Sequence, residues 1–328
     1  MLSFRVLDLL PPPFHSIEVE VLSGLADVDI QEYEDEASLR EMVADIDALL
    51  LWYSIPVPQG VIAGMEKCKV IVDAGVGYDN IDLEAAGRKG ICVCNVPDYC
   101  VDEVADHTLG LILALTRKIS SMNKSVHSGQ WDFRLAIPVT RLRGKVLGVV
   151  GLGRIGSAVA LRCHALGMRI LVYDPYIPPG KERSFGAEAV SWNRILEESD
   201  VLTLHVPLTE ETRHMVGPDE FRRMKDTAVV INTSRGEVIA REALQEALEA
   251  GLIAGAACDV LEDEPPIGGQ FDPEDPLLQH DNFVVTPHMA FFSYESGVEL
   301  RTKAAEEVAR VLKGEEPRAP VNLEYLRR

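Results

Sequence analysis

The sequence has no apolar run of membrane-spanning length and no excess of positive charge. Its apolar stretch from Ala48 to Tyr53 is strand-sized, whereas a membrane-spanning helix needs about 20 apolar residues. Lysine and arginine number 32 against 52 aspartates and glutamates, for a formal charge of −20. Because such a charge repels phosphates over a long approach, we expect neither nucleic acid nor a membrane as partner.

Paired cysteine motifs and a secretory leader are also missing. The six cysteines, at positions 68, 92, 94, 100, 163 and 258, show no CxxC spacing. Residues 1–14 lack a basic stretch followed by an apolar core and a small-residue cleavage site. Cys92 and Cys94 are two residues apart on a predicted strand, so they lie on the same face of it. This placement favours core packing over metal or disulfide roles. We therefore expect a reduced, cytoplasmic protein without a metal site.

Short apolar runs alternate with amphipathic stretches along the whole chain. This order is typical of an α/β fold with parallel sheets covered by helices on both faces. At 328 residues with 47% hydrophobic content, the chain suits two domains. The first series of predicted strands is EVEVL (18–22), DALLLWY (47–53), CKVIVDAG (68–75) and GICVCNV (90–96). Predicted helices between them are SLREMVADI (38–46) and LEAAGRKG (83–90).

A long helix over about 101–119 and a polar, loop-rich stretch to about Gly144 separate this series from a second one. The second series has six predicted strands: KVLGVVGLG (145–153), MRILVYD (168–174), SDVLTLHV (199–206), DTAVVINT (226–233), AGAACDV (254–260) and NFVVTPH (282–288). A last helix is predicted over about 296–313, followed by a charged tail after Gly314. Since this helix is extra to the six-strand count, it can cross back to the first domain.

The run from Val146 to Gly156 reads as a buried strand, a G-x-G-x-x-G turn and a helix. Gly151 permits the tight turn, Gly153 lets the backbone approach a pyrophosphate, and Gly156 allows close packing of helix and strand. The helix amides then face the phosphates. Because a dinucleotide fold begins with this turn, the residues before it must form another domain.

A second strand ends at Asp174, about where a dinucleotide fold places the acid that binds the adenosine ribose. Its carboxylate repels a 2′-phosphate, and Pro175 and Tyr176 supply no basic replacement. The sequence therefore predicts NAD rather than NADP. The alternative is a glycine-rich turn beside a surface aspartate.

Three polar residues follow strands of the second series: Arg235, Glu264 and His288. Interconversion of a 2-hydroxy acid and a 2-oxo acid needs a cation for the carboxylate and a proton donor or acceptor at C2. Arginine and histidine meet these needs, and a glutamate stabilises the imidazolium. Taken singly, His288 could equally be a packed or surface histidine, Arg235 part of a solvated turn, and Glu264 a solvated acid. Their joint placement at strand ends favours the functional interpretation.

The chain resembles the D-isomer-specific 2-hydroxyacid dehydrogenases over nearly its whole length. The matching segments are GVGYDNID, NVPDYCVDEVADHTLGLIL, LRGKVLGVVGLGRIG, VYDPY, VINTSRGEVI, GAACDVLEDEPP and TPHMAFFS. NVPDYCVDEVAD, the strand end at Asp174 and the aromatic Phe291 are most similar to the C-terminal-binding-protein branch. The resemblance implies two similar Rossmann-like or flavodoxin-like domains with parallel sheets and an active-site cleft between them. Residues 1–99 with 293–328 would form the substrate domain, and residues 100–292 the NAD-binding domain.

The resemblance also implies roles for individual residues. Arg235 would anchor the substrate, His288 would act as general acid/base, and Glu264 would be its partner. Asp259 would orient the nicotinamide amide, and the helix that begins near Val101 would build a homodimer interface. Further implied cofactor contacts are Thr108, Gly151, Gly153, Arg154, Ile155, Gly156, Asp174, His205, Thr212, Thr233, Ser234, Arg235 and His288. Implied substrate contacts are the Gly75, Val76 and Gly77 amides with Tyr53, Ser54, Arg235 and Phe291.

The predicted activity is NAD-dependent interconversion of a small (R)-2-hydroxy acid and its 2-oxo acid, as in glyoxylate or hydroxypyruvate reductases or phosphoglycerate dehydrogenases. A formate dehydrogenase is disfavoured, since that branch pairs its histidine with glutamine. The alternative is an NADH-sensing scaffold that binds peptides, like the corepressors of the C-terminal-binding-protein branch. For a phosphorylated substrate, Arg134 or Arg141 would supply a cation. The acidic stretch 265–281 has no functional explanation from the sequence.

Overall fold

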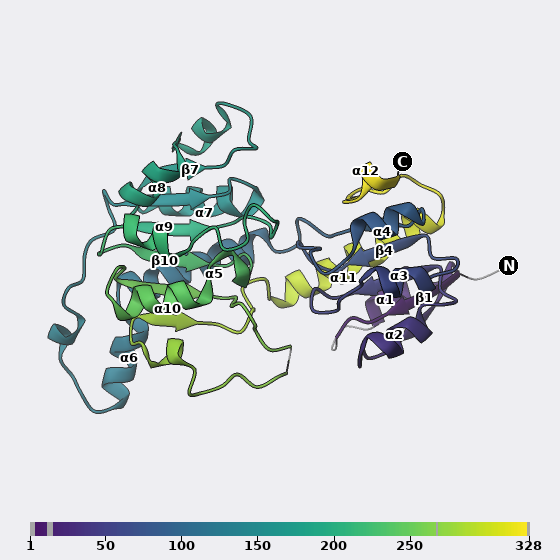
Figure 1. The fold of residues 1–328 in the computed structure, drawn as a ribbon, viewed down its shortest axis with the longest axis horizontal. Coiled ribbons are helices and arrows are strands. Elements are labelled where there is room, and N and C mark those ends of the chain that lie inside the picture. The colour runs from purple at the N-terminus through teal and green to yellow at the C-terminus, as the bar shows by residue number, and fades with distance from the viewer. Residues whose placement is uncertain (1–3, 12–15, 267, 327–328) are drawn as a thin grey trace. The chain divides into compact units, whose positions relative to one another are not determined.

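The computed structural model describes residues 4–11, 16–266 and 268–326. The chain divides into two compact units (Figure 1). Unit 1 comprises Met1–Tyr99 and Ser293–Arg328, and unit 2 comprises Cys100–Phe292. Each unit is an α/β layer structure around a parallel sheet, which confirms the predicted fold class.

Unit 1 is built on a parallel sheet in the order β2-β1-β3-β4-β5 over the described residues. Its strands are β1 (Phe4–Asp8), β2 (Ala26–Ile30), β3 (Ala48–Leu51), β4 (Val70–Asp73) and β5 (Cys92–Cys94). Its helices are α1 (Ser16–Val21), α2 (Glu36–Met42), α3 (Gln59–Gly64), α4 (Leu83–Arg88), α11 (Tyr294–Leu312) and α12 (Leu323–Leu326). All residues of β3 and β4 are buried, as expected for central strands covered on both faces.

The prediction of a strand over EVEVL is wrong, because these residues belong to α1. Glu18 is fully buried, as is Leu22 just after the helix, while Val19 is 46% exposed. Four residues of spacing put Glu18 and Leu22 on one helical face, whereas the strand prediction relied on a period of two. The edge strand β2 and its neighbour β1 were not predicted.

The last long helix, α11, belongs to unit 1. It packs against α1, β3 and β4, which agrees with the expectation that this helix returns to the first part of the chain. Its buried Arg301 forms an ion pair with Glu18 across 2.7 Å and also donates to the Pro11 carbonyl oxygen. The segment after Gly314, predicted as a charged tail, contains α12, which packs on α4.

Unit 2 holds a parallel sheet of seven strands among the described residues, in the order β12-β11-β10-β9-β6-β7-β8. The strands are β6 (Val146–Val150), β7 (Arg169–Tyr173), β8 (Ala187–Ala189), β9 (Val201–Leu204), β10 (Val229–Asn232), β11 (Gly255–Cys258) and β12 (Phe283–Val285). The helices are α5 (Val101–Thr116), α6 (Ile119–His127), α7 (Arg154–Ala165), α8 (Trp192–Glu198), α9 (Pro218–Arg223) and α10 (Arg241–Glu249). Short 3-10 helices are η1 (Phe133–Ala136), η2 (Lys181–Phe185), η3 (Gly236–Val238) and η4 (Pro276–Gln279).

The six strands predicted for this part of the chain are all present, and the short strand β8 was missed. The predicted helix over 101–119 ends at Thr116, and a second helix, α6, begins at Ile119. The stretch predicted as loop-rich therefore contains α6 and η1, which extend away from the sheet (Figure 1).

The strand order in unit 2 reverses between β6 and β9. From β6 the sheet grows toward β7 and β8 on one side and toward β9 through β12 on the other. Open α/β sheets bind ligands outside the carboxyl ends of the strands at such a point. The loops after β6 and β9 are therefore the places to look for a dinucleotide site.

All six cysteines are buried and free of disulfides. Cys92 and Cys94 lie on the same face of β5, with their Sγ atoms 3.6 Å apart. Within the described residues, no cluster of three or more potential metal ligands is found. No helix in that part of the chain is long and apolar enough to cross a membrane.

Candidate active site

Unit 2 brings the three strand-end residues to one edge of its sheet. Arg235 follows β10, Glu264 lies in the segment after β11, and His288 follows β12. Because β10, β11 and β12 are parallel neighbours, their carboxyl ends share this edge. The sequence predicted this placement at strand ends, and the catalytic roles of the three residues stay a prediction.

His288 and Glu264 form a close pair. The Nδ1 atom of His288 lies 2.5 Å from Oε1 of Glu264, and both side chains are partly buried. The second carboxylate oxygen of Glu264 accepts a hydrogen bond from the Leu261 amide at 3.3 Å. The glutamate is thereby oriented, and it stabilises a proton on Nδ1, so Nε2 is the ring nitrogen suited to exchange a proton with a substrate.

Asp259, just past β11 and only 2% exposed, organises the loop that carries His288. Its Oδ1 accepts from Thr286 Oγ1 at 2.5 Å and from the Met289 amide at 3.0 Å. Its Oδ2 accepts from the Ala290 amide at 2.8 Å. These bonds hold His288 in a left-handed backbone conformation, with φ 48°, which a non-glycine residue adopts only where surrounding structure imposes it.

The loop after β10 is clamped by Asn232, which is buried. Its Oδ1 accepts from the amide and the hydroxyl of Ser234, at 3.0 and 2.8 Å. Its Nδ2 donates to the Arg235 carbonyl oxygen at 2.8 Å. Sequence reasoning missed this residue, although an asparagine at a buried strand end three residues before an arginine is a detectable signal. The clamp fixes the backbone from which the Arg235 guanidinium projects.

The glycine turn between β6 and α7 has the shape that a pyrophosphate requires. Gly151 has φ 88°, and a Cβ there would lie 2.5 Å from the His205 carbonyl oxygen. A Cβ on Gly156 would collide with the Gly151 carbonyl oxygen, whereas one on Gly153 would meet open space. The first amides of α7 have no intrahelical acceptor and carry the positive end of the helix dipole. The turn thus leaves room for an anion at Gly153.

Asp174 stands beside this turn. Its Oδ2 accepts from the Leu152 amide at 2.8 Å and its Oδ1 from the Tyr176 amide at 2.9 Å. Each carboxylate oxygen keeps lone-pair capacity for a ribose hydroxyl. Lys181, which was not predicted from the sequence, also reaches this turn. Its Nζ donates to the Leu152 carbonyl oxygen at 3.3 Å.

His205 follows β9 and faces the glycine turn through its backbone. Its Nε2 lies 2.9 Å from the hydroxyl of the buried Thr203, and burial lowers the pKa of its imidazole to about 3. Its Nδ1 is buried and has no hydrogen-bond partner among the described residues. A neutral ring with an unmatched polar atom at this place, together with the room at Gly153 and the orientation of Asp174, fits a dinucleotide.

The other predicted cofactor contacts lie around the same edge. Thr108 is fully buried on α5 and bonds through its hydroxyl to that of Thr233 at 2.9 Å. Thr212 closes a turn by donating to the Pro207 carbonyl oxygen at 2.6 Å. Arg154 and Ile155 begin α7.

The predicted substrate residues of unit 1 lie on two loops after strands. Gly75, Val76 and Gly77 follow β4; Asn95 Nδ2 donates to the Val76 carbonyl oxygen at 2.7 Å. Tyr53 and Ser54 follow β3, where Asn80 Nδ2 donates to the Ile55 carbonyl oxygen at 2.9 Å. Phe291 belongs to unit 2, where its ring meets the His288 ring edge-on, with centroids 6.3 Å apart.

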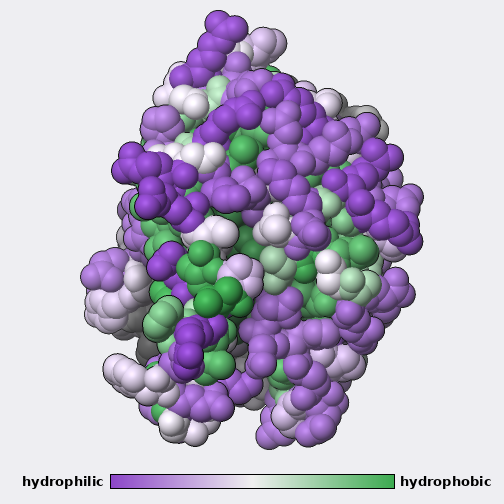
Figure 2. Space-filling model, turned by 90° about the vertical axis from the view of Figure 1, so that its left-hand side faces the viewer, coloured by the Kyte–Doolittle hydropathy of each residue, from purple (hydrophilic) through white to green (hydrophobic). Residues whose placement is uncertain are grey.

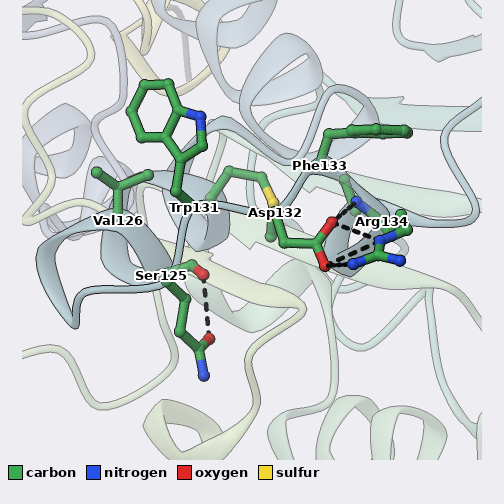
Figure 3. Close-up of a pocket in the computed structure, with 9 residues that line it drawn as sticks. Ser125, Val126, Trp131, Asp132, Phe133 and Arg134 are labelled. Atoms are coloured by element: carbon green, nitrogen blue, oxygen red, sulfur yellow. Dashed lines mark hydrogen bonds and ion pairs between the residues drawn. The ribbon is translucent and has the colours of Figure 1, made fainter.

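One hollow of unit 2 lies on the segment around α6 and η1. It has a volume of about 670 Å³ and includes Trp131, Asp132, Phe133 and Arg134 in its lining (Figure 3). Asp132 and Arg134 pair with each other, with Nη2 and Oδ2 2.6 Å apart, while Trp131 and Phe133 are 88% and 83% exposed. None of the predicted catalytic residues lines it, so it is a separate feature from the strand-end edge.

Comparisons with known proteins agree with this geometry. Residues 109–290 match the family model described as D-isomer specific 2-hydroxyacid dehydrogenase, NAD binding domain. The D-3-phosphoglycerate dehydrogenase of Methanocaldococcus jannaschii is 42% identical over 316 residues, which are 96% of this chain but 59% of that protein. The glyoxylate reductase of Korarchaeum cryptofilum is 40% identical, with 91% of each chain covered.

Among solved structures, a D-lactate dehydrogenase from Aquifex aeolicus, complexed with NAD and lactic acid, has a TM-score of 0.87 and 29% identity. The match covers 98% of this chain and 97% of that one. The C-terminal-binding-protein branch suggested by the sequence is not specified by these comparisons and stays a prediction. The family model, the relatives and the strand-end geometry lead to one conclusion: the chain belongs to the D-isomer-specific 2-hydroxyacid dehydrogenases, and residues 109–290 are its NAD-binding domain.

Proposed function

We propose that this protein interconverts a small (R)-2-hydroxy acid and its 2-oxo acid with NAD as the redox partner. The observation that carries the proposal is the His288–Glu264 pair, 2.5 Å apart, on the sheet edge that also presents Arg235. An acid/base group oriented by a carboxylate beside a cation is what a 2-oxo acid needs for reduction. The enzymes named among the relatives support this proposal over the scaffold alternative.

In the direction of reduction, the bound cofactor supplies the hydride that C2 of the substrate accepts. Arg235 binds the carboxylate of the substrate and polarises its carbonyl oxygen. His288 donates a proton from Nε2 to that oxygen as charge develops on it. Glu264 stabilises the imidazolium before transfer, and Asp259 keeps the ring in place through the backbone of its loop. In the direction of oxidation, His288 takes the proton from the hydroxyl.

Unit 1 supplies the proposed selectivity. The amides of the 75–77 loop would bind the substrate carboxylate, and Tyr53 and Ser54 would contact the substrate side chain, with Phe291 contributing from unit 2. The 75–77 loop is held by Asn95, and the loop after β3 by Asn80. Each loop is thus tied to a neighbouring segment of unit 1 by a side-chain amide. The relatives named glyoxylate reductase and D-3-phosphoglycerate dehydrogenase favour glyoxylate or the 2-oxo acid that corresponds to 3-phosphoglycerate as the substrate.

The direct test follows NADH oxidation with glyoxylate, hydroxypyruvate, 3-phosphohydroxypyruvate, pyruvate and phenylpyruvate. We expect turnover with at least one of them, and a loss of about 10²–10⁴-fold in kcat for His288→Gln with NADH binding retained. A matched control is His280→Gln, since His280 follows η4 away from the trio. Protein that binds NADH but turns over none of the panel would contradict the proposal.

We further propose that the protein is a homodimer that uses the segment 119–137. This segment carries exposed apolar side chains, namely Ile119, Val126, Trp131, Phe133, Leu135 and Ile137. Figure 2, which views the left-hand side of Figure 1, shows apolar areas between hydrophilic ones. A group of exposed apolar side chains of this kind, two of them aromatic, marks an association surface. From the resemblance, the interface was expected instead on the preceding helix, α5.

The oligomeric state is measured by light scattering during size-exclusion chromatography. We expect a dimer for the wild type and a monomer, or a dimer weakened at least about tenfold, for the Trp131→Ser, Phe133→Ser double variant. The control is Tyr176→Ser, because Tyr176 is also an exposed aromatic residue, 77% accessible, but lies outside the segment. A monomeric wild type would contradict this part of the proposal and leave the proposed reaction standing.

A further inference from the structure

Lys181 is the first residue of η2, and its ammonium group reaches the glycine turn. Its Nζ lies 3.3 Å from the carbonyl oxygen of Leu152, the residue between Gly151 and Gly153. Gly180 precedes it with φ 93°, and the Gly180 amide donates to Glu182 Oε2 at 2.9 Å. The backbone at the start of η2 is thereby fixed. It places the Lys181 ammonium against the glycine turn between β6 and α7.

Leu152 connects this ammonium to the proposed ribose acid. Its amide donates to Asp174 Oδ2 at 2.8 Å, while its carbonyl oxygen accepts from Lys181. A carboxylate and an ammonium thus lie on either side of a single residue, directly before the open space at Gly153. Both groups border the place where the adenosine ribose of a dinucleotide lies when its pyrophosphate is on the turn.

The two groups favour different atoms of that ribose. A carboxylate accepts hydrogen bonds from the hydroxyls and repels a phosphate on the same sugar. An ammonium has three donors and no acceptor, so it binds the sugar oxygens and attracts a phosphate strongly. The basic replacement that is missing directly after Asp174 in the sequence is therefore present in space.

We propose that Lys181 is a second determinant of cofactor choice, which donates to the ribose oxygens of NAD and receives the 2′-phosphate of NADP when Asp174 no longer repels it. The proposal rests on the proposed NAD-dependent function. Selectivity for NAD is then a balance between two opposed charges. Asp174 excludes NADP, while Lys181 tightens either cofactor and supplies most of the latent affinity for NADP.

Arg183 supplies a matched control. It lies two residues further along η2, and its side chain is 86% exposed, with Nε 3.7 Å from Glu182 Oε1. Arg183→Met removes one positive charge from the same 3-10 helix without touching Leu152. A general effect of net charge on an anionic ligand would appear equally in this variant and in Lys181→Met.

The experiment measures Kd for NADH and NADPH by titration calorimetry. The proteins are the wild type, Lys181→Met, Asp174→Asn, the double variant and Arg183→Met. We expect Asp174→Asn to tighten NADPH by about tenfold or more, and Lys181→Met in that background to weaken NADPH by about tenfold or more. In the wild-type background, Lys181→Met weakens NADH by about threefold to tenfold. Arg183→Met changes each Kd by less than about twofold.

Two results would overturn the inference alone. One is an unchanged Kd for NADPH when Lys181→Met is added to Asp174→Asn, and the other is an equal effect of Arg183→Met. In both cases tight binding of NADH by the wild type keeps the proposed function intact. A wild type that binds neither dinucleotide would overturn the proposed function and this inference together.

Discussion

Asp8 in unit 1 and Asp259 in unit 2 occupy similar places but differ in their partners. Asp8 ends β1 and Asp259 directly follows β11, so each lies at the carboxyl end of a parallel strand, and both are shielded from solvent. Asp259 accepts three hydrogen bonds, which use both of its oxygens. Asp8 accepts one, from the Leu10 amide, and its Oδ2 has no partner among the described residues.

The difference shows that donors, not burial, decide what a buried acid does. With three donors, Asp259 anchors the loop that carries His288. With one donor, Asp8 is dominated by desolvation, which together with the nearby Glu18 carboxylate raises the pKa of its carboxyl to about 7. The Leu10 amide and Arg301 oppose this rise without cancelling it. One aspartate is a fixed anchor and the other holds a proton near neutral pH.

The largest expected effect comes from removing the cation of unit 1. Arg301→Met leaves Glu18 and Asp8 buried without a positive partner, so we expect the free energy of unfolding to fall by about 3–5 kcal/mol. Urea denaturation measures it. Arg318→Met is the control, because Arg318 pairs with Glu306 on the surface and its loss costs at most about 1 kcal/mol. Equal losses in the two variants would show that the buried pair is not needed.

The next largest effect is expected at the anchor of unit 2. Asp259→Asn places an amide group opposite backbone donors, so the His288 loop shifts and kcat/KM falls by about 100-fold. Steady-state kinetics with the best substrate of the panel measures this. Asp281→Asn is the control, since Asp281 is 81% exposed and pairs with Lys124. A loss for Asp259→Asn no larger than that of the control would refute its role as anchor.

An effect of comparable size that depends on pH is expected at Asp8. A carboxyl whose pKa is raised on folding stabilises the protein fully below about pH 4, and this contribution is lost as pH rises through about 7. Asp8→Asn removes that loss, so the variant is more stable than the wild type by about 2–4 kcal/mol at pH 8. The advantage shrinks toward pH 4.

Trp52 reports on unit 1 when Trp131 and Trp192 are replaced by phenylalanine, so its fluorescence can follow urea unfolding at each pH. Asp27→Asn serves as the control, because Asp27 is an exposed residue of β2 in the same unit. A difference between Asp8→Asn and wild type that stays constant from pH 4 to 8 would contradict the protonation of Asp8.

The smallest effect is expected from removing one of the hydrogen-bond donors to the Asp259 carboxylate. Thr286→Val removes one of its three hydrogen bonds, the 2.5 Å contact from Oγ1, and leaves both backbone donors in place. We expect a loss of about 1 kcal/mol, or roughly fivefold, in kcat/KM. Thr302→Val is the control, because the Thr302 hydroxyl donates to the Val298 carbonyl oxygen within α11. A loss as large as that of Asp259→Asn would show that Thr286, not the carboxylate, holds the loop.

Local pattern was enough to predict most of unit 2. Its strands are apolar runs bounded by glycine turns or polar residues, and the carboxyl ends of parallel strands meet at one edge. The order of strands along the sequence was therefore enough to predict that Arg235, Glu264 and His288 lie at the same sheet edge. Strand β8, with the sequence Ala-Glu-Ala, was missed because neither residue type favours strands and its pairing with β7 is a tertiary contact.

Unit 1 was less predictable because long-range contacts decide its elements. The buried Glu18 pairs with Arg301, which lies 283 positions later in the chain. Because this partner is not visible locally, the Glu-Val alternation of α1 led to the wrong prediction of a strand. Lys181 was missed for a related reason. It lies in the charged run of η2, and only the folded path of the chain brings its ammonium to Leu152. The assignment of substrate contacts to Tyr53, Ser54 and the 75–77 loop stays a prediction.

The return of α11 to unit 1 has a consequence for how the chain folds as it is synthesised. The ribosome releases α1 and the strands of the first sheet early, but the helix that covers β3 and β4 emerges only after all of unit 2. Unit 2 is contiguous and can complete its core first. Glu18 meanwhile awaits Arg301, and the apolar face of β3 and β4 stays uncovered. The first part of the chain to be made is thus the last to be finished, and it is the part that chaperones have most reason to bind.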